Sequence, residues 1–215
     1  MALTLANLVA NRTLSPEMAA TLAAAAEERH SILFVAIPRM AGKSTLMQAM
    51  LQHAPAGTSF YRLSRAEGPD LGIPASGDGG YLVVSEISTA PYADYLWGAD
   101  ARRVFAALDR EFSLATALHA GGVDEAFEVL TQDNGIPVEQ AARIDLVVYV
   151  RSIGPWSRPT RRVVSEVAET DGIDPRAARV LHRWSEPDDR FEVIKQSQRI
   201  EVAAIERYHN VFTAP

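Results

Sequence analysis

Cysteine is absent from this 215-residue chain, which excludes disulfide bonds and thiolate metal sites. An excess of positive charge is also lacking, since 21 Lys and Arg stand against 27 Asp and Glu. A nucleic-acid or anionic-membrane surface needs concentrated Lys and Arg, so we expect no nucleic-acid partner. No apolar run approaches the ~20 residues that span a bilayer, and no basic region precedes the apolar residues of the N-terminus. The sequence therefore predicts a cytoplasmic protein that is at most peripheral to a membrane.

Lysine is scarce as well, because Lys43 and Lys195 are the only two in the chain. Arginine therefore supplies nearly all of the positive charge. Lys43 lies in the stretch ILFVAIPRMAGKSTLMQAM, residues 32 to 50. Its first half is apolar and β-branched, which predicts a buried parallel strand, and its second half has apolar residues at helical spacing. A tight loop ending in Gly-Lys-Ser-Thr joins the two halves.

A strand, a Gly-Lys-Ser-Thr loop and a helix in this order are typical of a phosphate-binding loop. Backbone N–H groups at the start of the helix bind phosphate oxygens, the lysine reaches the β- and γ-phosphates, and the serine hydroxyl ligates Mg²⁺. We therefore predict a site for ATP and Mg²⁺, with Ser44 as a metal ligand. The predicted nucleotide-binding residues are Arg39, Ala41, Gly42, Lys43, Ser44 and Thr45. The alternative is an ordinary helix N-terminus with a polar first turn.

The loop departs from the usual pattern G-x-x-x-x-G-K-[ST] at its first position. Ile37 stands where that pattern has glycine, and Pro38 confines Ile37 to extended geometry. The chain must therefore leave the strand without glycine's access to positive φ. If the backbone at Ile37 is strained, a glycine there is expected to tighten nucleotide binding.

Two later predicted strands end in polar side chains. Four apolar residues, 81 to 84, begin a predicted strand that ends in Glu86, and residues 112 to 118 are predicted to form a strand that ends in His119. Open α/β sheets bind ligands at the carboxyl ends of their strands. Glu86 is thus a candidate to orient an attacking water or to hold Mg²⁺, and His119 a candidate to donate to a phosphate oxygen. Each has a plainer alternative as a polar residue that ends a strand.

The order of the predicted elements indicates an α/β fold. Residues 1 to 30 are predicted to be helical, with Ser15 as a cap and Pro16 as the first residue of the second helix. Strands and helices then alternate four times, which implies a parallel sheet with right-handed crossovers. The remaining predicted elements are a strand over 161 to 169, a hairpin of 180 to 184 and 191 to 194, and a closing helix over 198 to 209.

With these segments in order, the chain resembles the RecA-like motor domain of the secretion ATPases of type II and type IV systems, which include the pilus assembly and retraction motors. LSPEMAATLAAAAEERHSILFVAIPRMAGKSTLMQAML is similar to that family's helix, strand and Walker A segment. YLVVSEI is similar to its Walker B segment, SLATALHAG to its His box, and ARIDLVVYVRSIG with TRRVVSEVAE to the strands that follow. The last two similarities lie far from the loop.

The resemblance implies a RecA-like P-loop NTPase fold: a three-layer sandwich with a mostly parallel sheet and a C-terminal β-hairpin. Residues 1 to 30 would be an N-terminal helical segment, and residues 31 to 215 the ATPase domain. Glu86 would be the Walker B glutamate and His119 the second histidine of the His box, both catalytic, with Glu86 also at the metal. ATP binding or hydrolysis would drive a conformational change in a homo-oligomer or with proteins of a secretion or pilus machine.

Two departures from that family leave an alternative open. The Arg-Asp pair after the Walker B glutamate is replaced by Ser88 and Thr89, and the first His of the His box falls near Glu111. The chain can therefore also be read as a degenerate, non-hydrolysing relative with a structural or regulatory role. A small P-loop kinase is less favoured because no arginine-rich lid is apparent.

In that family, arginines from a separate N-terminal domain complete the ATP site, and residues 1 to 30 are too few to supply one. A cationic contact is then expected from this chain or from a neighbouring subunit, and hydrolysis is expected to depend on association. The candidates are Arg102, Arg103, Arg151, Arg158, Arg161 and Arg162.

Overall fold

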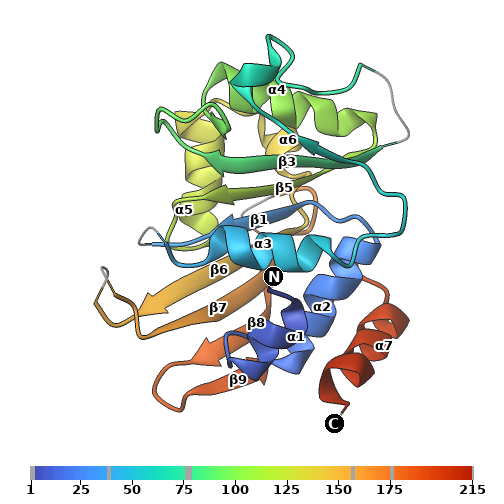
Figure 1. Ribbon diagram of the computed structural model, residues 1–215, viewed down its shortest axis with the longest axis vertical. Helices are drawn as coiled ribbons and strands as arrows, with labels where there is room; N and C mark the ends of the chain where they lie inside the picture. Colours follow the sequence, from blue (N-terminus) through green and yellow to red (C-terminus); the bar gives the residue numbers. More distant parts are fainter. Residues whose placement is uncertain (1–2, 38–39, 76–78, 156–157, 175–176, 215) are drawn as a thin grey trace.

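A nine-stranded sheet forms the centre of the computed structural model, which describes residues 3 to 37, 40 to 75, 79 to 155, 158 to 174 and 177 to 214 (Figure 1). The strands are β1 (Ile32–Val35), β2 (Phe60–Arg62), β3 (Gly80–Ile87), β4 (Tyr95–Leu96), β5 (Phe112–Leu118), β6 (Leu146–Ile153), β7 (Arg161–Glu169), β8 (Arg179–Ser185) and β9 (Arg190–Val193). The α-helices are α1 (Leu5–Ala10), α2 (Pro16–Glu27), α3 (Lys43–Leu51), α4 (Ala99–Ala107), α5 (Val123–Glu128), α6 (Val138–Ala141) and α7 (Val202–Thr213). Short 3₁₀ turns cover Arg65–Glu67 and Leu108–Arg110, and a π-helical turn at Val129–Asp133 continues α5.

The sheet is largely parallel, as the alternation of strands and helices predicts. Its order is β2-β3-β5-β1-β6-β7-β8-β9, with β4 pairing on β3. Every pairing from β2 to β6 is parallel, whereas β7, β8 and β9 add antiparallel strands beside β6. The predicted C-terminal hairpin is thus confirmed as β8 and β9. Together with β7, these two strands extend the sheet beyond its parallel part.

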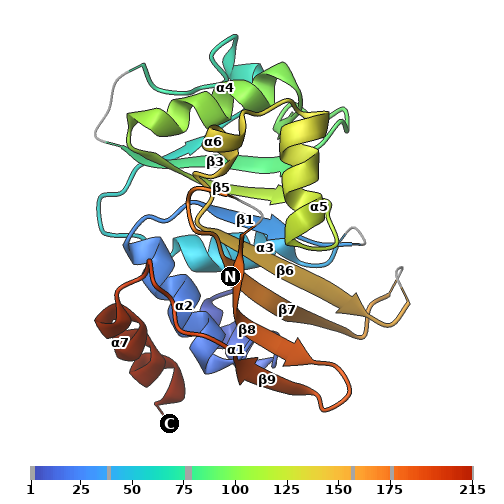
Figure 2. The same ribbon diagram turned by 180° about the vertical axis from the view of Figure 1, so that it is seen from behind.

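Helices cover both faces of the parallel part, so the molecule has three layers. In Figure 1, α1, α2 and α3 lie in front of the sheet, and α5 and α6 are nearer in the reverse view of Figure 2. Alternate residues of β1 enter different cores: Ile32 and Phe34 pack with α2 and α3, whereas Leu33 and Val35 pack with α4 and α5. All four are fully buried, which confirms the prediction of a strand buried on both faces.

The N-terminal helices belong to the same packed body as the sheet. Ser15 caps α2 by accepting a hydrogen bond from the Met18 N–H at 3.2 Å, and Pro16 is the first helical residue, as predicted. A run of alanines, Ala23 to Ala26, is fully buried. Their small side chains let α2 lie close to its neighbours in the core. None of the helices in the described part of the chain is long and apolar enough to cross a membrane.

The closing helix begins later than its sequence pattern predicts. The prediction placed it from Gln198, but α7 starts at Val202. Glu169 of β7 accepts hydrogen bonds from the backbone N–H groups of Gln198 and Arg199 and from the Ser197 hydroxyl. Because these contacts hold residues 197 to 199 against the end of β7, the helix can form only beyond them.

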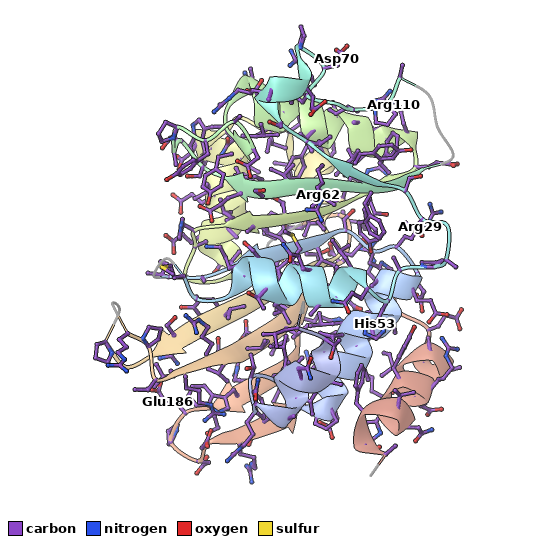
Figure 3. The ribbon with its side chains drawn as sticks, viewed as in Figure 1. Arg29, His53, Arg62, Asp70, Arg110 and Glu186 are labelled. Carbon is purple, nitrogen blue, oxygen red and sulfur yellow. The ribbon has the colours of Figure 1, made fainter. Side chains whose placement is uncertain are left out.

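α7 packs on α2 and also reaches the end of α3. His53, labelled in Figure 3, follows α3 and lies edge-on to the rings of Tyr208 and Phe212, with centroid distances of 5.3 and 5.8 Å. Burial lowers the pKa of His53. The three aromatic side chains therefore connect the C-terminal helix to the helix that carries Lys43.

A buried histidine gives the fold a pH dependence. His182 of β8 has its Nε2 atom 2.8 Å from the Thr21 hydroxyl, and burial lowers its pKa to about 4. In the unfolded chain, histidine titrates near pH 6.5. Between these two values the unfolded state binds more protons than the folded state, so the free energy of unfolding falls as the pH is lowered.

We predict that this effect removes about 2 kcal/mol from the free energy of unfolding between pH 7 and pH 5. The difference between the parent and His182→Gln, measured by urea unfolding at both pH values, isolates it because glutamine does not titrate. Equal losses in the two proteins would contradict the prediction.

Candidate functional site

The Gly42 loop, residues 36 to 42, leads from β1 into α3. Its Pro38 and the predicted site residue Arg39 lie outside the described residues. Met40 and Gly42 have positive φ of 63° and 102°, whereas Ile37 is half exposed and does not adopt positive φ. The left-handed turns therefore fall on Met40 and Gly42, and the suspected strain at Ile37 is not found. Gly42 is the N-cap of α3, where glycine adopts this conformation at little cost.

Lys43, the first residue of α3, meets two of the other predicted site residues. Its Nζ atom lies 3.4 Å from Glu86 Oε2 and 3.4 Å from His119 Nδ1, and Glu86 Oε1 lies 3.1 Å from His119 Nε2. Lys43 is 5% exposed and Glu86 is 8% exposed. A buried lysine, a buried carboxylate and a partly exposed imidazole thus form one cluster at the N-terminus of a helix.

The sheet topology explains why these side chains meet. β3 and β5 are adjacent and parallel, and β5 pairs with β1, so their carboxyl ends lie at one edge. His119 directly follows β5, and the Gly42 loop follows β1. The pairing of β3 with β5 shifts register between Val84 and Ile87, and Glu86 lies in that irregularity. Bulges of this kind re-aim side chains near functional sites.

The hydrogen-bonding pattern favours one tautomer of His119. If Nε2 carries the proton, it donates to Glu86, and Nδ1 accepts from the Lys43 ammonium group. Donation from Nδ1 to the Ala36 carbonyl oxygen, 3.3 Å away, would leave the Nε2 lone pair facing a carboxylate. His119 therefore contacts both the Glu86 carboxylate and the Lys43 ammonium group. A ligand that displaces either group would also change the hydrogen bonds of His119.

A cavity of about 770 Å³ opens above the cluster. It is large enough for a nucleotide, since small-molecule sites measure roughly 300 to 1,000 Å³. The predicted site residues in its lining are Ala41, Gly42, Lys43, Ser44, Thr45, Glu86 and His119. Ser44 and Thr45 are exposed to it. The structure thus brings together all of the predicted site residues that it describes.

Two groups of residues that line the cavity were not predicted from the sequence to belong to the site. One comes from α1 and the following turn, through Leu8, Asn11 and Thr13. No sequence signal marks these residues, because only the return of β7 brings them near: the Val164 N–H donates to the Thr13 carbonyl at 2.7 Å. The other group is Tyr92 and Tyr95, whose rings lie 5.0 Å apart, in the segment after β3.

The two arginines of β7 in the lining differ in their partners. Arg161 pairs with Asp189, donates to the Arg12 carbonyl at 2.9 Å and lies over the Trp184 ring. The hydrogen bond from Arg161, followed by one from Trp184, lowers the pKa of Asp189. Arg161 is therefore tied to the β8–β9 turn. Arg162 instead contacts the Gly42 loop, with Nε donating to the Met40 carbonyl at 2.9 Å.

The donor groups fit a magnesium ion that is held mainly by a nucleotide. Within the described ranges, no group of three or more His, Asp or Glu side chains could hold a metal alone. Mg²⁺ usually keeps several waters and binds through one or two protein oxygens together with substrate phosphates. The Ser44 hydroxyl and the Glu86 carboxylate line one cavity and supply that kind of oxygen.

No protein-family model matches the chain, and no curated protein is significantly similar to it in sequence. Among solved structures, the chain is similar to the VirB11 ATPase from the Brucella suis type IV secretion system, crystallised with sulphate. The TM-score is 0.48 with 17% sequence identity, and the match covers 75% of this chain and 54% of that chain. The chain thus spans about half the length of that protein. A similarity of this size assigns neither a family nor a function.

Proposed function

We propose that this chain is a RecA-like P-loop protein that binds ATP with Mg²⁺ at the Gly42 loop and hydrolyses it. The observation that carries the proposal is the meeting of Lys43, Glu86 and His119 at the N-terminus of α3, beside a cavity of about 770 Å³. In our interpretation, residues 31 to 215 form the ATPase domain. The helical segment of residues 1 to 30 contributes part of the cavity wall.

Each residue of the cluster has a distinct role in this proposal. The first N–H groups of α3 and the Lys43 ammonium bind phosphate oxygens, which replace Glu86 as the partner of Lys43. Glu86, released from that ion pair, orients a water for attack and accepts its proton. His119 donates from Nε2 to Glu86 before ATP binds and is placed to donate to the terminal phosphate afterwards. Mg²⁺, held by Ser44 and Glu86, would neutralise phosphate charge.

The role of the ATPase in the cell follows the family resemblance. We propose that it acts in the cytoplasm, in a homo-oligomer or with proteins of a secretion or pilus machine, and that ATP binding or hydrolysis drives a conformational change there. A non-hydrolysing relative remains the second candidate. The ion pair between Lys43 and Glu86 favours it, because a nucleotide phosphate would have to displace Glu86 from Lys43.

Thermal unfolding with nucleotide tests the binding step. A ligand that binds only the folded state at ~100 times its Kd stabilises it by about 2.7 kcal/mol, which is about 5 to 10 °C for a chain of this length. We predict such a rise in Tm with Mg²⁺-ATP for the parent and none for Lys43→Ala.

Lys195→Ala is the matched control, because it removes the only other lysine, which is exposed near the end of β9. It should respond to ATP as the parent does. An unchanged Tm of the parent at millimolar Mg²⁺-ATP would overturn the proposed function.

A further inference from the structure

The six arginines that are candidate cationic partners of the nucleotide differ in their contacts. Arg102 donates to the Asn134 carbonyl at 2.6 Å and Arg103 to the Pro69 carbonyl at 2.6 Å. Arg151 pairs at 2.9 Å with Glu186, labelled on the β8–β9 turn in Figure 3, and Arg161 pairs with Asp189. Arg158 is exposed and does not line the cavity. Arg162 is left as the arginine that both lines the cavity and contacts the Gly42 loop.

Arg162 fits closely against that loop. Its Nε atom donates to the Met40 carbonyl at 2.9 Å, and a Cβ atom added at Gly42 would lie 3.1 Å from its Cδ atom. Within the described part of the chain, that bond is the single hydrogen bond of its side chain, and no carboxylate lies within ion-pair distance of it. The guanidinium therefore keeps its terminal nitrogens, Nη1 and Nη2, available beside the N-terminus of α3.

The sheet order places Arg162 opposite the acidic side of the site. Glu86 lies in β3 and His119 directly follows β5, both on one side of β1, whereas Arg162 lies in β7, beyond β6 on the other side. Arg162 is paired with Ser152 near the carboxyl end of β6, so it lies at the same edge as the loop. An anion bound at the N-terminus of α3 would therefore have two cationic neighbours, Lys43 from α3 and Arg162 from β7.

We infer that Arg162 is a nucleotide-binding residue supplied by the chain's own β7, with Nε bracing the Gly42 loop and Nη1 and Nη2 binding a phosphate oxygen of ATP. The inference rests on the proposed function. A guanidinium offers a planar fork of donors that matches a phosphate group, and its charge persists at any physiological pH. The antiparallel strand β7 thus contributes a residue to the site from the side of β1 opposite to β3 and β5.

Arg162→Gln separates the two contacts of this side chain. Glutamine places a nitrogen donor on Cδ, where arginine has Nε, so the bond to Met40 can persist while the charged fork is removed. We predict that the Kd for Mg²⁺-ATP rises about 10- to 100-fold, the range expected when a hydrogen bond to a charged group is lost. The Tm without nucleotide should stay within about 2 °C of the parent. Arg162→Lys, which keeps the charge without the fork, should recover part of the affinity.

Two controls distinguish the failure of this inference from the failure of the proposed function. Arg158→Gln removes the same charge outside the cavity and should change the Kd less than 2-fold. Parent-like affinity in Arg162→Gln, in a series where Lys43→Ala abolishes binding, would overturn the role of Arg162 alone. A parent that does not bind Mg²⁺-ATP would overturn the proposed function and this inference with it. Weak binding by Arg162→Met alongside normal binding by Arg162→Gln would reduce Arg162 to a brace for the loop.

Discussion

Replacement of Glu86 by glutamine is expected to lower the rate of ATP hydrolysis by about 100-fold or more while ATP binding persists. Glutamine preserves the shape of the side chain but cannot accept a proton from the attacking water. The Lys43 ammonium, which lies 3.4 Å from the carboxylate, would meanwhile lose this ion pair while its contact with His119 Nδ1 remains. Affinity for ATP should therefore stay equal to that of the parent or increase. Phosphate release by the purified proteins and nucleotide titration measure the two quantities separately.

The outcome for Glu86 also separates the two candidate functions. Glu125 is a suitable control carboxylate, because it accepts a hydrogen bond from the Gly121 N–H at 2.7 Å and does not line the cavity. Glu125→Gln should keep most of the activity. If the parent binds ATP without releasing phosphate, the non-hydrolysing alternative is favoured. Parent-like hydrolysis by Glu86→Gln would exclude Glu86 as the base.

Replacement of Glu169 by alanine is expected to remove about 3 to 5 kcal/mol from the free energy of unfolding. Glu169 is 1% exposed and pairs with Arg179, and it also accepts the hydrogen bonds that hold residues 197 to 199. Burial opposes its charge, but the hydrogen bonds from Ser197, Gln198 and the others outweigh burial and lower its pKa. Its truncation would leave several buried donors without an acceptor and loosen the start of α7.

Glu166 of the same strand provides the comparison. It pairs with Arg183 at 3.0 Å, but both side chains are solvent-accessible, so Glu166→Ala should cost less than about 1 kcal/mol. Urea unfolding at pH 7 measures both variants. Equal losses would show that Glu169 does not hold the closing segment. Because its folded-state pKa is lowered, the contribution of Glu169 is present above its unfolded pKa and lost as the pH falls through the folded value.

Local patterns in the chain predicted most of the elements and which residues lie at the candidate site. The run of Phe112 to Leu118 and the alternation of Arg161 to Glu169 predicted β5 and β7 with their observed bounds. The Ser15–Pro16 pair predicted the start of α2 in the same way. These signals succeed because caps, apolar runs and strand alternation depend on neighbours in the sequence.

Non-local contacts determined two features that those local patterns did not predict, the start of α7 and the path of the Gly42 loop. The start of α7 was wrong in the sequence prediction because Glu169, which lies 29 residues before Gln198, holds residues 197 to 199 against the end of β7 by hydrogen bonds. Likewise, the motif marks Ile37 as the position where backbone strain could arise, but the positive φ falls on Met40 and Gly42. The path of a short loop depends on what packs against it, and here Arg162 of β7 does so.

By itself, the sequence determined that Lys43, Glu86 and His119 would each follow or end an element at the carboxyl edge of a parallel sheet. Only the tertiary structure decided that the three touch, because contact requires β3, β5 and β1 to be neighbours and a register shift to turn Glu86. It also determined that, of the six candidate arginines, Arg162 both lines the cavity and contacts the Gly42 loop. Which arginine lies there depends on the order of the strands and on which carboxylates pair with the other arginines. The spacing of residues along the chain specifies neither.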